Sequence, residues 1–306
     1  MSFEVLNPGM LTLLQDSGRI GFQHLGITTG GPMDEHAFYW ANRLLGNKPD
    51  ATQLEITFGQ LKLQVNAATT LAITGADLSA TLNDKVIQPW LTYAVKPGDV
   101  LAFGAPKSGL RTYLAVAGGF ECEPKLGSCS TVKREQLGGL TGLGDALKTG
   151  DILPFTATTE FTEQRTPKWA IPDYDAPLEL GVMPSYQHAS FSHDEQMTFF
   201  TSEYEVSQNI DRMGYRLSGA PVKSSLDGII SEGIAFGAIQ IPNDGQPIVL
   251  MKDRQTIGGY PKIGCLSSLG AGQLSQRQPG QIVTFSPMDV ADAEVERRLF
   301  NRVIFG

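Results

Sequence analysis

Hydrophobic and polar residues alternate along short segments in the first half of the chain. Residues 61–65 read Leu-Lys-Leu-Gln-Val, and this strict alternation predicts a strand with one buried face. Residues 54–58 and 70–74 are short runs rich in residues that favour strands. Residues 113–117 are apolar throughout, which predicts a strand buried on both faces. The pattern therefore predicts almost continuous β-structure between residues 53 and 117.

The period of the pattern changes at residues 34–45, which predict the first helix. Asp34 and Glu35 place negative charge at its positive N-terminal end, and Gly46 is a typical residue just after a helix. The apolar residues expected on its buried face are Ala37, Ala41, Leu44 and Leu45.

A second helix is predicted at the C-terminus. Ser286 and Asp289 have the spacing of a capping box, and Pro287 suits the first helical position. We expect the apolar stripe of this helix to pack against the body of the protein; its members are Ala291, Val295, Leu299 and Val303.

Residues 238–251 predict a β-hairpin. Residues 238–241 are a short β-rich run, and residues 242–245 read Pro-Asn-Asp-Gly, which favours a tight turn. Residues 247–251 supply the return strand, with Pro247 at its start because proline cannot donate a ladder hydrogen bond.

One turn pattern occurs in both halves of the chain. Residues 96–103 read Lys-Pro-Gly-Asp-Val-Leu-Ala-Phe and resemble Gln-Pro-Gly-Gln-Ile-Val-Thr-Phe at 278–285, with a looser copy at 148–155. Each copy is a glycine turn that leads into a strand, so the copies suggest two β units of related design. Residues 156–177 are rich in Thr, Pro and charge, and are the best candidate for the connection.

Composition excludes several classes of function. The 306 residues include 34 glycines and 18 prolines, which fit one large or two ordinary domains with many turns. The formal net charge is −8 and there is no dense run of Lys or Arg, so we expect neither nucleic acid nor membrane as a partner. We see no signal-peptide pattern and no apolar run long enough to span a bilayer, and we expect a cytoplasmic protein.

The three cysteines are Cys122, Cys129 and Cys265. Their spacing does not fit a metal site, and we expect no bound metal. Because an odd number argues against a disulfide framework, we expect buried or half-buried thiols in a reducing compartment.

Few familiar catalytic motifs are present. The sequence has neither a P-loop nor a His-Glu-x-x-His motif. Residues 127–131 read Gly-Ser-Cys-Ser-Thr, which could cradle an anion or form a structural turn. Met251-Lys252 is followed by Asp253, unlike the Met-Lys-Met hairpin of a biotin-accepting lysine, so we expect no covalently bound biotin.

Polar side chains crowd the turns of residues 209–262. Gly258 and Gly259 allow a ligand to approach the backbone closely, which favours a binding site over a plain surface loop. Asp253 could be surface charge or a carboxylate placed for proton transfer. The side chains able to bind a ligand here are Arg212, Gln240, Asp253, Arg254, Gln255, Thr256, Tyr260 and Lys262.

Motifs that occur in order along nearly the whole chain carry a family resemblance. They lie at residues 7–9, 15–19, 31–34, 41–47, 54–57, 113–119, 127–131, 212–217 and 243–262. Together they resemble the allophanate hydrolase second-subunit family, also called the biotin-dependent carboxyltransferase family. That family includes the carboxyltransferase domain of urea carboxylase, the sporulation-kinase-inhibitor antagonist protein and the C subunit of 5-oxoprolinase.

The resemblance implies a mainly β fold of two tandem cyclophilin-like β-barrel units, with a few short helices and a C-terminal helix. We place the units at residues 1–165 and 166–306. It also implies a hydrolase subunit of an ATP-dependent 5-oxoprolinase assembly, which opens 5-oxoproline to glutamate. The expected partners are a homologue of the first allophanate hydrolase subunit and a further 5-oxoprolinase subunit, and ATP need not bind to this chain.

Two alternative functions stay open. The chain could be a carboxyltransferase component that acts on a biotin-carried carboxyl group and an amide substrate. It could also be a non-catalytic binding antagonist of a kinase-inhibitor-like partner.

We expect the catalytic residues to be Asp253 and Lys262. Asp253 would orient the substrate or accept a proton, and Lys262 would stabilise negative charge on a carbonyl or phosphoryl oxygen. The alternative is that these two residues form a structural ion pair. We expect a ligand groove lined by residues of both halves, with Asp16, Arg19 and Asn42 from the first and Arg212, Gln240 and Lys262 from the second. The substrate is expected to be a lactam or amide, and the candidates to bind it are Asp16, Arg19, Asn42, Arg212, Gln240, Gln255, Thr256 and Tyr260.

Overall fold

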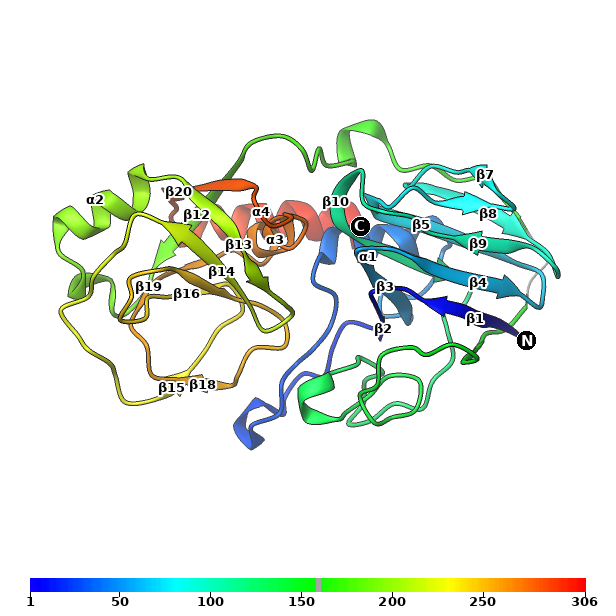
Figure 1. Ribbon diagram of the computed structural model, residues 1–306, viewed down its shortest axis with the longest axis horizontal. Helices are drawn as coiled ribbons and strands as arrows, with labels where there is room; N and C mark the ends of the chain where they lie inside the picture. The colour runs from blue at the N-terminus through cyan, green and yellow to red at the C-terminus, as the bar shows by residue number, and fades with distance from the viewer. Residues whose placement is uncertain (158–160) are drawn as a thin grey trace. The chain divides into compact units, whose positions relative to one another are not determined.

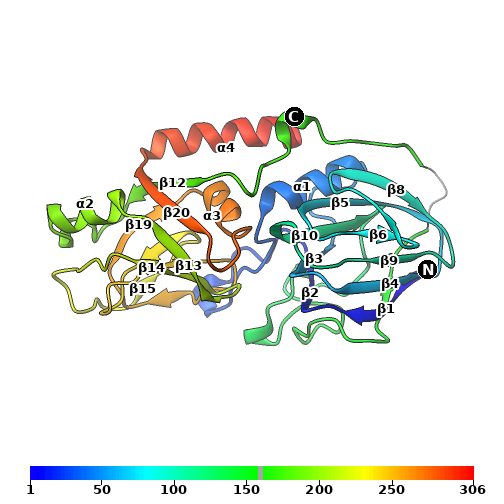
Figure 2. The same cartoon turned by 45° about the horizontal axis from the view of Figure 1, so that its top comes forward.

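The chain forms two compact units, each rich in β-strands (Figures 1 and 2). The computed structural model describes residues 1–157 and 161–306. Unit 1 contains Met1–Ile20 and Gly30–Asp175, and unit 2 contains Gly21–Thr29 and Ala176–Gly306. The strands confirm the predicted mainly β fold.

The first unit continues past the expected boundary at residue 165. Tyr174 is buried, and its hydroxyl donates to Asp34 Oδ2 at 2.9 Å. Thr166 N donates to Trp90 O at 3.1 Å, so this stretch is also held to unit 1. Part of the predicted linker at 156–177 therefore belongs to the first unit, while residues 158–160 of it lie outside the described residues.

Unit 1 contains two antiparallel sheets that share one hydrophobic core, to which Phe3, Leu63, Ile73 and Leu114 belong. The first sheet has the order β11 (Ile152–Pro154), β1 (Ser2–Pro8), β4 (Leu61–Val65), β9 (Val100–Ala102), β6 (Thr81–Leu82) and β7 (Lys85–Val86). The second has the order β2 (Leu11–Gln15), β3 (Gln53–Thr57), β10 (Ser108–Val116), β5 (Thr69–Asp77) and β8 (Leu91–Val95).

Helix α1 (Glu35–Leu44) covers the outer face of the second sheet. Its N-terminus is capped by Asp34, whose Oδ1 accepts from Ala37 N at 3.1 Å. Ala41 and Leu44 pack with Ala115 of β10, while Leu114 on the other face of β10 joins the core between the sheets. Strand β10 is therefore buried on both faces, as its apolar sequence predicts.

Unit 2 contains a closed barrel of seven strands. Their order is β12 (Leu178–Pro184), β19 (Lys262–Leu266), β16 (Ala238–Gln240), β17 (Ile248–Leu250), β14 (Gly214–Gly219), β13 (Tyr204–Ile210) and β20 (Ile282–Pro287). The predicted hairpin is confirmed, since Ile239 pairs with Val249 and Gly245 N donates to Pro242 O at 2.9 Å.

A small ribbon and three helices complete unit 2. The ribbon pairs β15 (Glu232–Gly233) with β18 (Ile257–Gly258). The helices are α2 (His193–Thr201), α3 (Ser268–Leu274) and α4 (Val290–Phe305). Short 3-10 turns at Gln23–Leu25, Lys133–Glu135, Lys168–Ala170 and His188–Ser190 lie in the connections. In the described chain, no helix is both long and apolar enough to cross a membrane.

The predicted start of the C-terminal helix was wrong. Ser286 and Pro287 belong to β20, where they pair with Gly181 and Val182 of β12, so they cannot begin a helix. Asp289 caps the helix instead, because its Oδ1 accepts from Ala291 N at 3.0 Å.

The predicted packing stripe of α4 was also wrong. Val295 and Leu299 are 54% and 57% exposed, while Phe300 and Ile304 are the buried residues of this helix. Helical spacing identified an apolar stripe, but it does not say whether the chain itself covers that stripe.

The repeated turn has the same hydrogen bonds in all three copies. The glycine has a positive φ of 89–94°, a conformation that glycine adopts at little cost. In each copy, the glycine N–H donates to the carbonyl of a valine on a neighbouring strand. The N–H of the same valine donates to the carbonyl of the residue after the glycine, and both bonds measure 2.8–2.9 Å. The glycine–valine pairs are Gly98 with Val65, Gly150 with Val5, and Gly280 with Val206. The copies in both units therefore perform one structural task, which is to join a turn to an adjacent strand.

Gly280→Ala should lower the free energy of unfolding by about 1 kcal/mol or more. The cause is conformational, because a Cβ at Gly280 meets no atom within 4 Å but φ is +90°. Gly233→Ala is the matched control, since Gly233 also has open space and lacks a positive φ. Denaturant titration of both variants measures the difference, and equal losses would contradict this explanation.

Candidate functional site

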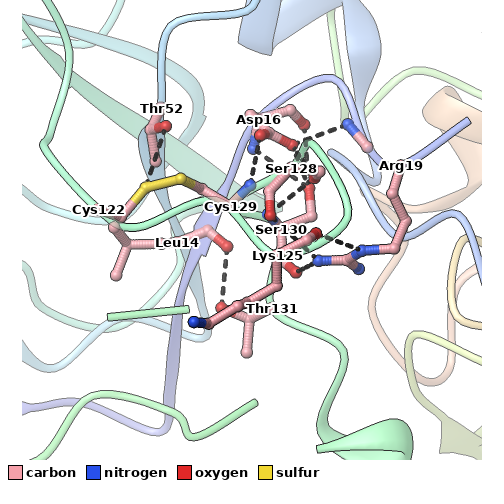
Figure 3. The surroundings of a disulfide bond; sticks show 11 residues. Leu14, Asp16, Arg19, Thr52, Cys122, Lys125, Ser128, Cys129, Ser130 and Thr131 are labelled. Carbon is pink, nitrogen blue, oxygen red and sulfur yellow. Dashed lines mark hydrogen bonds between the residues drawn. A yellow bond between two sulfur atoms is a disulfide. The ribbon is translucent and has the colours of Figure 1, made fainter. Parts of the chain in front are cut away.

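The carboxylate of Asp16 accepts hydrogen bonds from the loop at residues 127–131, which the sequence pattern indicated as a possible anion-binding loop (Figure 3). Its Oδ1 accepts from the hydroxyls of Ser128 and Ser130 at 2.6 and 2.7 Å, and from Gly18 N at 2.9 Å. Its Oδ2 accepts from Cys129 N at 2.6 Å. The anion in this loop is therefore the protein's own carboxylate, which favours the structural interpretation of the motif.

Arg19 holds the same loop from another side. Its side chain is 1% exposed, and Nη2 donates to Ser130 O at 2.7 Å and to Ser128 O at 3.4 Å. The guanidinium Nε donates to Lys125 O at 3.4 Å. These contacts bind Arg19 to the backbone of its own unit (Figure 3).

The expectation that all three cysteines are thiols was wrong. Cys122 and Cys129 form a disulfide, while Cys265 is a free thiol. The loop between the pair folds back through hydrogen bonds between Lys125 and Ser128, which brings the two Cα atoms to 6.3 Å. Burial raises the pKa of the Cys265 thiol to about 11, so this thiol stays protonated at neutral pH.

Asn42 is also engaged with its own chain. It is fully buried in α1, and its Nδ2 donates to Pro49 O and Ala51 O, each at 3.0 Å. Its Oδ1 accepts from Asn47 Nδ2 at 3.0 Å. The observed contacts of the three first-half candidates thus fold loops of unit 1, and the groove shared by both halves stays a prediction.

The outer face of the barrel in unit 2 carries a cavity of about 350 Å³. Alternation along β17 explains its position, because Val249 points into the barrel with no exposed surface while Ile248 and Leu250 line the cavity. Three of the predicted substrate-binding residues meet there, namely Gln240, Gln255 and Tyr260. The other lining residues are Asn209, Asp211, Met213, Gly214, Arg216, Ile234 and Arg254.

Arg254 is the buried cation in the wall of this cavity. It is 6% exposed, and its Nε and Nη1 donate to the carbonyls of Ile234 and Met251 at 3.0 and 3.2 Å. Its own carbonyl accepts from Thr28 Oγ1 at 2.9 Å. Burial lowers the pKa of Arg254 to about 10, so it remains charged at neutral pH. A guanidinium held by neutral carbonyls can bind an anion such as a carboxylate.

Asp253, the residue before Arg254, forms a buried ion pair with Arg212. Its two carboxylate oxygens accept from Arg212 Nε and Nη2, each at 2.9 Å, in a bidentate pair. Both side chains are more than nine-tenths buried, and Asp253 N also donates to Arg212 O at 2.7 Å. This pair ties the loop after β17 to the turn before β14, directly beside the cavity.

Lys262 pairs with Glu232 rather than with Asp253, so the alternative of an Asp253–Lys262 ion pair was wrong. Lys262 Nζ lies 2.6 Å from Glu232 Oε1, and Gln187 Nε2 donates to the same oxygen at 3.0 Å. The hydrogen bonds from Lys262 and Gln187 lower the pKa of Glu232. Lys262 is a neighbour of Gln240 across β19 and β16, which places its charge near the cavity wall.

Two further expectations concern the loop after Asp253. Thr256 accepts a bond from Ile234 N through its carbonyl at 3.1 Å and does not line the cavity. A Cβ at Gly258 would lie 2.7 Å from Gln240 Nε2, so this glycine makes room for a side chain of the protein itself.

The sequence pattern grouped Arg254 with the other polar residues. What distinguishes it is its burial among carbonyls, with no carboxylate in a salt bridge to it among the described residues.

Asp16→Asn should lower the free energy of unfolding by about 2 kcal/mol, because charged acceptors of buried hydrogen bonds are worth more than neutral ones. Thermal and denaturant unfolding measure this change. Asp50→Asn, at an exposed turn of the same unit, is the control. An unchanged stability for Asp16→Asn would contradict a structural role.

Asp253→Asn should lower the free energy of unfolding by about 3 kcal/mol or more, because it removes the carboxylate charge that balances the buried charge of Arg212. The double variant Asp253→Leu with Arg212→Met should recover part of that loss, since no buried charge of the pair remains. Unfolding of the single variants Asp253→Leu and Arg212→Met and of the double variant gives the coupling energy. A coupling near zero would show that the pair does not support the fold.

Comparisons with known proteins agree with this architecture. The chain is 37% identical over 295 residues to the C subunit of 5-oxoprolinase from Escherichia coli, covering 95% of this chain and 92% of that protein. It is 34% identical over 297 residues to the Haemophilus influenzae protein of the same name, covering 96% and 94%.

A solved structure, the K. lactis urea amidolyase, matches with a TM-score of 0.93 and 29% identity. The match covers 99% of this chain but only 20% of that much longer protein. The family model described as carboxyltransferase domain, subdomain A and B, matches residues 25–287. By fold and by sequence, this chain therefore belongs to the carboxyltransferase-domain family.

Proposed function

We propose that this chain is a subunit of an ATP-dependent 5-oxoprolinase assembly that opens 5-oxoproline to glutamate. The observation that carries the proposal is the similarity to the 5-oxoprolinase C subunits over nearly the full length of both chains. The cavity beside Arg254 supports it, because 5-oxoproline carries a carboxylate and a lactam amide.

In this proposal, Arg254 binds the substrate carboxylate. The amide side chains of Gln240 and Gln255 donate to and accept from the lactam, and Tyr260 forms one wall. Binding groups of both kinds in one small cavity would select a cyclic amide that bears a carboxylate.

Lys262 and Asp253 have different roles in the reaction. Lys262 would stabilise negative charge that develops on the lactam or phosphoryl oxygen. Asp253 would hold Arg212 and the adjoining backbone of Arg254 in place, because both of its oxygens are already occupied. ATP would activate the poorly electrophilic carbonyl, and since the sequence lacks a P-loop, we propose that a partner subunit binds the nucleotide.

Reconstitution with the two partner subunits tests this function. We expect ATP-dependent release of glutamate from 5-oxoproline by the assembly and none by the single chain. Arg254→Gln should lower kcat/KM by about 10- to 100-fold, as for loss of a charged hydrogen bond. Arg134→Gln, at a partly exposed pair in unit 1, is the matched control. An assembly that does not open the lactam, or full activity with Arg254→Gln, would contradict the proposal.

A carboxyltransferase function is the second candidate. The match to urea amidolyase favours it, and the same cavity would then hold an amide substrate near a biotin-carried carboxyl group. Because Lys252 lacks the biotin-acceptor context, a partner would have to carry the biotin. Transfer of labelled carboxyl from carboxybiotin to an amide, independent of 5-oxoproline, would distinguish this activity from the first.

A further inference from the structure

Helix α4 buries little of its surface. Of its 16 residues, only Phe300 and Ile304 are buried, and every residue at 290–299 is exposed or half-buried. Helices in proteins gain most of their stability by packing an apolar face. The first three turns of α4 therefore carry an apolar face that unit 2 itself does not cover.

The uncovered face is continuous. Val295 and Leu299 are more than half exposed and lie one turn apart, so their side chains are neighbours, and exposed Ala291 extends the row. A single exposed apolar residue is common in soluble proteins, but a row of them beside a groove is typical of an interaction surface.

A groove of about 500 Å³ runs beside this row, between α4, α3, β12 and β20. Leu299 belongs to both the row and the groove. Three carboxylates line the groove, from Glu179, Asp292 and Glu296, and none of its described lining residues is Lys or Arg. Its apolar floor and walls come from Leu180, Leu269, Pro287 and Met288.

We propose that this surface, the α4 groove, docks an amphipathic segment of a partner subunit. Apolar side chains of that segment cover Val295 and Leu299, and its Lys or Arg side chains pair with the three carboxylates. A second copy of this chain would bring the same acidic groove and a net charge of −8, so like charges would repel. A partner segment with basic side chains therefore suits the groove better than a second copy. That the partner belongs to a 5-oxoprolinase assembly rests on the proposed function.

Binding of the purified first-subunit-like partner, measured without substrate or ATP, tests the proposal. The apolar double variant Val295→Asp with Leu299→Asp should raise Kd at least about tenfold. The charge variant Asp292→Lys with Glu296→Lys should also raise Kd, and it should reduce the dependence of Kd on salt. Both variants change exposed residues, so both should remain folded, and thermal unfolding checks this. The charge variant should melt slightly lower, because Asp292 lies in the first turn of α4 and a lysine there opposes the helix dipole.

Control variants at exposed positions of unit 1 are Val86→Asp and Asp50→Lys, which should bind like the unaltered chain. Wild-type affinity in both α4 variants would overturn the proposal, as would failure of the unaltered chain to bind the partner. It would equally be overturned if the variants abolished self-association while partner binding persisted. A complex that depends on the groove but releases no glutamate would contradict the proposed function and support the docking surface.

Discussion

The alternation of side chains along the strands of a closed barrel is the constraint on which the candidate site depends. In unit 2, Ile239 and Val249 fill the barrel, so their neighbours Gln240, Ile248 and Leu250 must point outward. Those outward residues form the cavity wall, and a register shift of one residue would exchange the wall with the core. The same pairing that stabilises the barrel therefore also positions the proposed binding groups.

Three buried basic residues near this cavity differ in how their charge is balanced. Arg212 is matched by the two oxygens of Asp253, and Lys262 by Glu232. Arg254 is instead held by two neutral carbonyls. Because paired charges are satisfied within the protein and a carbonyl-bound guanidinium is not neutralised, Arg254 is the group best suited to attract an anionic substrate.

Polar residues of unit 1 illustrate the opposite outcome. Asp16 and Arg19 occur in a motif that looks suited to a ligand, yet their hydrogen-bonding groups meet the loop around Ser128 and Ser130. A loop rich in glycine and hydroxyl groups has many donors and acceptors, and these must be matched inside a folded domain. A conspicuous polar motif can therefore serve the fold rather than a substrate.

Local patterns in the sequence determined much of the secondary structure. The strand at residues 61–65, the helix capped by Asp34, the hairpin at 238–251 and the repeated glycine turn all follow from contacts close in sequence or from alternation. Family motifs also led to the correct family.

The tertiary structure alone decided which partner each charge takes, because Arg212 and Asp253 are 41 residues apart. It likewise decided that unit 1 extends to Asp175 and that the apolar stripe of α4 faces outward. Each of these depends on which surfaces are brought together in space, and helical or strand periodicity carries no information about that.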